Sequence, residues 1–72
     1  MQQFRVLAGV RVEVRKQEGI QWRGFTTTKE TRLDEPIRRS RTSVVFVSAE
    51  WLLRVKTHDV QIYNGLRWVQ MK

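Results

Sequence analysis

Apolar and polar residues alternate along the first part of the chain. The apolar residues fall on six successive even positions: Phe4, Val6, Ala8, Val10, Val12 and Val14. A period of two is typical of a strand with one buried face. Gly9 interrupts the alternation, so the pattern predicts a strand over 4–14 with a bend or bulge near Gly9.

Three further segments have the composition of strands. Residues 20–28 contain Trp22, Phe25 and three threonines, and residues 44–47 form a short apolar run that is typical of a buried strand. Residues 60–63 and 66–69 flank Asn64-Gly65, the pair favoured in two-residue type I′ hairpins. The hairpin would pair Tyr63 with Leu66 and would place Gln61, Tyr63, Leu66, Trp68 and Gln70 on one side. The other side, with Val60, Ile62, Arg67, Val69 and Met71, is the expected core face.

Two segments allow more than one interpretation. Ser48 can cap a short helix over 49–54, which we expect here, and the alternative is that Trp51, Leu53 and Val55 continue as a strand. Residues 31–42 hold the only proline and a dense group of arginines, and we expect a charged, partly mobile loop there.

These elements predict one mainly β domain over 1–72. The expected fold is a small, twisted antiparallel barrel or sheet of SH3-like or OB-like type, with four or five strands and at most one short helix near 49–54. An α+β sheet with one packed helix is the alternative.

The charge balance adds a functional direction. The chain has 72 residues, with 14 Lys and Arg against 7 Asp and Glu, and a formal net charge of +7. Ten of the basic residues are Arg, whose planar fork of donors matches phosphates. The sign of the charge and the excess of Arg favour a polyanionic partner. The longest apolar run, 44–47, is too short to span a membrane, and the first residues lack a secretory signal, so we expect a cytoplasmic protein.

The sequence offers little for catalysis. It has no cysteine, which excludes disulfides and thiolate chemistry, and its single histidine, His58, has no companion residues for acid–base work. The carboxylates do not cluster and there is no glycine-rich phosphate loop. We therefore expect neither an enzyme nor a metal or other cofactor.

Two groups of residues are candidates for nucleic-acid contacts. Arg38, Arg39 and Arg41 form the densest basic cluster. Arg11 and Arg15 share a face of the first strand, where Glu13 would interrupt a stripe completed by Lys16 and Arg23. Aromatic rings can add base stacking. Tyr63 and Trp68, on the more polar hairpin face, are the candidate rings, while Trp22 and Trp51 are assigned mainly to the core.

We therefore expect a small basic module that binds DNA or RNA through an Arg and Lys surface, with exposed aromatic rings as additional contacts. The alternative is a small adaptor or regulator that binds an acidic surface of a larger protein machine, such as a polymerase, nuclease or capsid.

A third hypothesis comes from a resemblance. Val14-Arg15-Lys16, Gly19, Trp22 and Gly24, together with 60–63, resemble two segments of the plasmid-encoded SH3-barrel dihydrofolate reductases. The resemblance implies a homotetramer with a shared central pore. Its pore would bind NADPH and dihydrofolate through Lys16, Gln61, Ile62 and Tyr63. The match covers about ten residues, and the expected Asn-Gly hairpin departs from the family, which follows its pore motif with a turn of helix.

Overall fold

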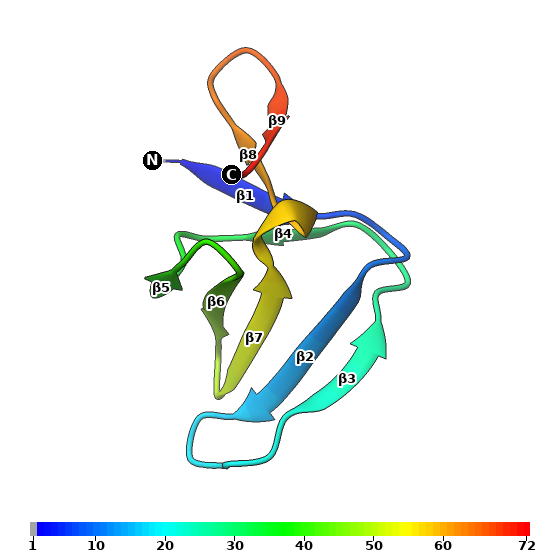
Figure 1. The fold of residues 1–72 in the computed structure, drawn as a ribbon, viewed down its shortest axis with the longest axis vertical. Coiled ribbons are helices and arrows are strands. Elements are labelled where there is room, and N and C mark those ends of the chain that lie inside the picture. Colours follow the sequence, from blue (N-terminus) through cyan, green and yellow to red (C-terminus); the bar gives the residue numbers. More distant parts are fainter. Residues whose placement is uncertain (1) are drawn as a thin grey trace.

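The computed structural model describes residues 2–72 as two antiparallel sheets, between which the chain passes four times (Figure 1). The four-stranded sheet has the order β4 (Thr31–Leu33), β1 (Gln3–Val6), β8 (Gln61–Tyr63) and β9 (Trp68–Gln70). The five-stranded sheet has the order β3 (Arg23–Thr26), β2 (Arg11–Lys16), β7 (Trp51–Lys56), β6 (Ser43–Ser48) and β5 (Arg38–Arg39). The prediction of a mainly β antiparallel domain is confirmed. The sheets do not close into a barrel, and the strands are shorter and more numerous than expected.

The core lies where the inner faces of the two sheets meet. Phe4 from β1 and Phe46 from β6 are almost fully buried, with ring centroids 5.9 Å apart in an edge-to-face arrangement. The other residues of the core cluster are aliphatic or Met, namely Val6, Val12, Val44, Val55, Val60 and Met71. Their burial confirms most of the predicted inner face of the first strand, residues 44–46 of the predicted buried strand and the apolar core face of the last hairpin, whereas Ala8 and Val47 are exposed.

The bend predicted near Gly9 is a corner between the two sheets. Gly9 has a φ of +79°, a conformation that glycine adopts without the penalty of a Cβ atom. The corner is held by Thr27, whose carbonyl accepts from the Gly9 N–H at 2.8 Å and whose hydroxyl donates to the Leu7 carbonyl at 2.7 Å. The single strand expected over 4–14 is therefore divided into β1 and β2, each in its own sheet.

The helix expected over 49–54 is wrong. Residues 51–56 form strand β7, which pairs with β2 on one side and β6 on the other. A tight turn at Ala49 and Glu50 joins β6 to β7, and Ala49 has a φ of +54°. Two neighbouring strands satisfy the backbone groups of β7, and this long-range pairing outweighs the local capping signal at Ser48. Within residues 2–72 the only helical segment is the 3₁₀ turn η1 (Thr57–Asp59), so the α+β alternative is also wrong.

The last hairpin forms, but its loop is longer than two residues. Tyr63 pairs with Trp68 and Ile62 pairs with Val69, which leaves a four-residue loop over 64–67. The side-chain oxygen of Asn64 accepts from the N–H groups of Leu66 and Arg67 at 2.9 and 3.0 Å, which stabilises the wider loop. The observed register differs from the predicted one by two residues, and since side chains alternate with a period of two, the predicted faces of 60–63 and 68–71 are kept. Leu66 and Arg67 lie in the loop instead of the strand pair and are exposed.

The segment 31–42 is not one continuous loop. It contains the short strands β4 and β5, on different sheets. The turn that follows β5 is held at its base, because the buried Thr57 hydroxyl donates to the Ser40 carbonyl at 2.9 Å and the Thr57 N–H donates to the Thr42 carbonyl at 3.1 Å. Across residues 2–72, no helix is both long and apolar enough to cross a membrane.

Candidate functional site

Four arginines are held against tryptophan rings. On the outer face of the four-stranded sheet, the Arg5 and Arg32 guanidinium carbons lie 4.3 and 4.9 Å from the Trp68 ring centroid. The Tyr63 ring packs against the Trp68 ring, with the two ring centroids 5.4 Å apart. Tyr63 and Trp68 therefore share the polar face, as predicted, but both are partly buried and Trp68 is already in contact with two cations.

A second cluster of this kind lies on the outer face of the five-stranded sheet. Arg15 and Arg54 approach the Trp22 centroid at 5.0 and 4.1 Å. Arg15 also donates from Nη1 to the carbonyls of Lys16, Gln17 and Gly19 at 2.6–3.0 Å. Trp22 is thus only partly buried and lies outside the core cluster, against the prediction. The Arg15 hydrogen bonds stabilise the β2–β3 turn and occupy the guanidinium, so we do not count Arg15 as a phosphate contact.

Glu30 connects the arginines of the Trp68 cluster. Its carboxylate accepts from Arg32 at 2.7 Å and from Arg5 at 3.2 Å. The hydrogen bond from Arg32 lowers the pKa of Glu30, the charges of Arg32 and Arg5 add to this effect, and desolvation opposes it. A carboxylate whose pKa is lowered on folding stabilises the fold above its unfolded-state pKa. That contribution is lost as the pH falls through the lower folded-state value, and it is small at this exposed site.

Replacing Arg32 by Gln is therefore expected to raise the pKa of Glu30 toward its ordinary value, since the substitution removes the strongest interaction with the charged form. NMR titration of the Glu30 side-chain carboxyl measures the change. Lys29→Gln removes the same charge from the adjacent residue without touching either ion pair, and it should leave the titration nearly unchanged. Equal shifts in the two variants would contradict the assigned contacts.

The remaining basic side chains are exposed. Within residues 2–72, ten of the fourteen basic residues form no ion pair or side-chain hydrogen bond. Two of the seven acidic residues, Glu13 and Glu30, are paired with arginines within residues 2–72, so ten unpaired cations face five carboxylates that have no Lys or Arg partner. The net positive charge is therefore carried by accessible side chains. They are Arg11, Lys16, Arg23, Lys29, Arg38, Arg39, Arg41, Lys56, Arg67 and Lys72.

Several of these cations share the outer face of the five-stranded sheet. On this face Val45 of β6 pairs with Arg38 on one side and with Arg54 on the other, and Arg54 pairs in turn with Glu13. Directly paired residues of neighbouring strands point to the same side of a sheet, so these side chains share the outer face. Arg11 and Lys56 lie two residues further along their strands and therefore point the same way. We call the set Arg11, Arg38, Arg54 and Lys56 the basic face. Arg11, Arg54 and Lys56 line one shallow hollow of about 240 Å³, together with Glu13 and Ser43.

The carboxylate on the basic face is neutralised. Arg54 Nη2 lies 2.8 Å from Glu13 Oε1, and Arg54 Nε donates to the same oxygen at 2.9 Å. Glu13 lies between Arg11 and Arg15 as expected, but its charge is compensated. The prediction that Lys16 and Arg23 complete the same stripe is wrong, because they pair with Trp51 and Val14 and lie on the opposite face of the sheet. On the neighbouring strand Gly24 leaves room for the Arg11 side chain, since a Cβ there would lie 2.7 Å from Arg11 Nη2. The sequence prediction does not include Arg54 or Lys56, because the expected helix ends at Arg54 and the alternating pattern that continues the strand to Lys56 is only its alternative.

The predicted arginine cluster is divided between faces. Arg38 belongs to the basic face, whereas Arg39 pairs with the inward-facing Val44 and lies 5.8 Å from the Phe4 ring centroid. Arg41 is exposed in the turn after β5. The turn anchored by Thr57 therefore holds Arg41 in a defined position next to β5.

Lys16 and Arg23 lie at the other end of β2, around a groove of about 420 Å³ that also includes Trp51. Trp51 is 41% exposed, and its assignment to the core is wrong. It occupies an inward-facing position of β7, but the end of the five-stranded sheet reaches beyond the four-stranded sheet and is left uncovered (Figure 1). Nothing in the spacing of apolar residues shows where one sheet ends and the other continues.

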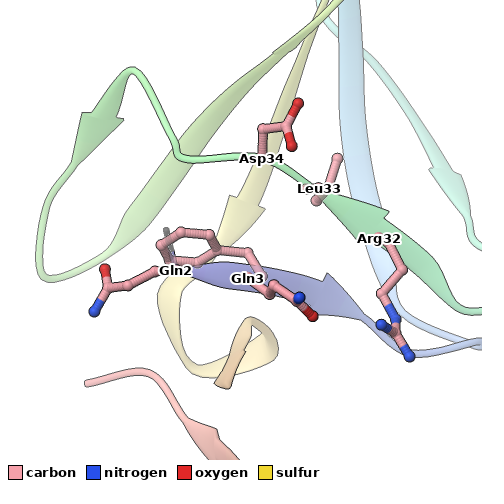
Figure 2. Close-up of a pocket in the computed structure, with 6 residues that line it drawn as sticks. Gln2, Gln3, Arg32, Leu33 and Asp34 are labelled. Carbon is pink, nitrogen blue, oxygen red and sulfur yellow. The ribbon is translucent and has the colours of Figure 1, made fainter. Parts of the chain in front are cut away.

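Other hollows bring no converging chemistry together. One of about 400 Å³ beside β1 and β4 is lined by Gln2, Gln3, Arg32 and Asp34, but Arg32 and Asp34 point away from each other (Figure 2). His58 is exposed in η1, with Asp59 at 3.7 Å. Residues 2–72 contain no group of three side chains arranged to hold a metal ion.

The residues implied by the reductase resemblance do not meet within one chain. Lys16 ends β2, while Gln61, Ile62 and Tyr63 form β8 near the opposite end of the molecule (Figure 1). Ile62 packs against the core, and Gln61 accepts a hydrogen bond from Arg5 at 2.7 Å. Comparison with protein-family models, curated proteins and solved structures gives no significant match.

Proposed function

We propose that the protein is a small nucleic-acid-binding module whose basic face contacts the phosphate backbone. The observation that carries the proposal is the hollow lined by Arg11, Arg54 and Lys56, in which the single carboxylate is already compensated by Arg54. Arg38 extends the same face toward the edge strand β5. Cations spaced along a rigid sheet suit a polymer of phosphates, since each contact releases counterions and adds to the affinity.

The arrangement of the other charges supports the same function. The four arginines that contact Trp22 or Trp68 are engaged within the fold, and the exposed cations outnumber the unpaired carboxylates. A polyanion would therefore meet a positive potential over much of the surface. Steering by such a potential speeds the encounter with nucleic acid.

Direct binding tests the proposal. Fluorescence anisotropy at physiological ionic strength would compare labelled single-stranded DNA, duplex DNA and RNA with a labelled poly-glutamate peptide of similar charge. We expect micromolar or tighter binding to at least one nucleic acid and much weaker binding to the peptide. The reverse order would favour an adaptor for an acidic protein surface.

A further inference from the structure

The Trp51 groove has features that the basic face lacks. Its lining combines an exposed indole ring, aliphatic side chains and three cationic residues, and no acidic residue lines it. Trp51 is 41% exposed and Ile20 is 94% exposed, so the groove presents an aromatic and an aliphatic side chain to solvent. The lining residues are Val14, Arg15, Lys16, Gly19, Ile20, Gln21, Arg23 and Trp51.

We infer that this groove binds an unpaired base of a single-stranded nucleic acid, which stacks on Trp51 while Lys16 and Arg23 contact the adjoining phosphates. The inference rests on the proposed function and names the form of nucleic acid that the protein prefers. A volume of about 420 Å³ lies within the usual range for small-ligand sites. Every base has a flat π face, so an exposed indole beside cations accepts bases of any sequence.

Of the three cations of the groove, Lys16 and Arg23 form no ion pair within residues 2–72, whereas Arg15 is engaged by the β2–β3 turn. Lys16 Nζ lies over the Trp51 ring, 6.0 Å from its centroid and at the outer limit of a cation–π contact, so a stacking base would meet a cation at the ring. Arg23 is exposed on the edge strand β3. Glu18 and Glu50 line a separate hollow on the far side of Lys16, and an anionic strand would therefore approach from the Arg23 side.

A second copy of the chain is a poor occupant for the groove. A symmetric dimer through this surface would place the same patch on both sides of the interface. Lys16 and Arg23 of one copy would then face those of the other, with no carboxylate of the groove to compensate them. Charge complementarity favours an anion, and the exposed ring favours a partner with flat aromatic surfaces.

The basic face and the groove can act on one strand. Arg11 and Lys16 mark the two ends of β2, about 17 Å apart at ~3.3 Å per residue, and alternation points them to opposite faces of the sheet, so a strand that contacts both must pass around the end of the sheet. A single strand of about 12 nucleotides is long enough to reach both. The groove should therefore add affinity for single strands, while duplexes, whose bases are stacked inside, should use the basic face alone.

Substitution of Trp51 tests the inference. An unstructured single-stranded DNA of about 12 nucleotides and its duplex would be titrated with the wild type, Trp51→Ala and Trp51→Phe. We expect Trp51→Ala to weaken single-strand binding about tenfold and to change duplex binding less than about twofold. Trp51→Phe keeps a ring and should stay close to the wild type. Phe25→Ala removes another half-exposed aromatic from the same sheet, outside the groove, and is the matched control.

The outcomes separate this inference from the proposed function. Circular dichroism would establish that each variant is folded, and a 2-aminopurine base in the strand should lose emission on binding the wild type but not Trp51→Ala. Wild-type single-strand affinity in Trp51→Ala, or equal losses on both probes, would overturn the base-stacking role and leave the basic face standing. Failure of the wild type to bind either probe would overturn both proposals.

Discussion

Replacing Arg11, Arg38 and Lys56 together by glutamine is expected to weaken nucleic-acid binding roughly 10²-fold at physiological salt. These three residues are the members of the basic face that have no partner in the fold. Each of the three substitutions should also reduce the slope of log K against log salt by about 1 unit, since each removes one cation from the phosphates. The folded state should be little affected, since all three side chains are exposed.

The matched control changes the same net charge elsewhere. Lys29, Arg67 and Lys72 are also exposed and unpaired, and they lie off the basic face. Replacing them by glutamine likewise lowers the formal charge from +7 by three. If binding depends on where the cations lie, this variant should keep most of its affinity. Equal weakening in the two triple variants would mean that net charge alone attracts the nucleic acid.

Phe46→Ala is expected to destabilise the protein by about 3–5 kcal/mol, the usual cost of removing a buried phenylalanine ring. Phe46 is 1% exposed and contacts Phe4 across the two sheets. At about 0.05–0.15 kcal/mol per residue, a chain of this length has only ~4–11 kcal/mol of stability in total. Much of the variant should therefore be unfolded near 37 °C. Urea denaturation followed by circular dichroism measures the loss.

Val47→Ala on the same strand is the control for this prediction. Val47 is 42% exposed, and alternation along β6 turns it away from the core. Its truncation should cost less than about 1 kcal/mol. A similar loss of stability in the two variants would show that the two-sheet core is not centred on Phe46.

The sequence was most informative where alternation and burial coincide. The apolar positions of β1, β2 and β6 identified the core, and Gly9 marked the corner between the sheets. The pattern was weakest where long-range pairing decides the structure. Residues 51–56 carry both a capping signal and an alternating pattern, and only their two partner strands select the strand.

At the candidate site, too, the local pattern predicted some features, and contacts formed only in the folded protein decided the others. Composition indicated a cationic surface, and the pattern placed Arg11, Glu13 and Arg15 on one face. The pattern could not indicate that Arg15 would donate hydrogen bonds to the β2–β3 turn, because the carbonyls that accept them are oriented only once the turn has folded. Nor could it indicate the exposure of Trp51, which depends on how far one sheet extends beyond the other.

The salt dependence of nucleic-acid binding tests the central claim most directly. Anisotropy titrations of the wild type with single-stranded DNA, duplex DNA and RNA would be repeated at several salt concentrations. Contacts from Arg11, Arg38 and Lys56, together with Lys16 and Arg23, predict a slope of log K against log salt near −3.5 on a single strand, at about 0.7 per phosphate. We expect that slope together with micromolar or tighter binding at physiological ionic strength. Binding that is absent there, or a slope near zero, would contradict a phosphate-contacting surface.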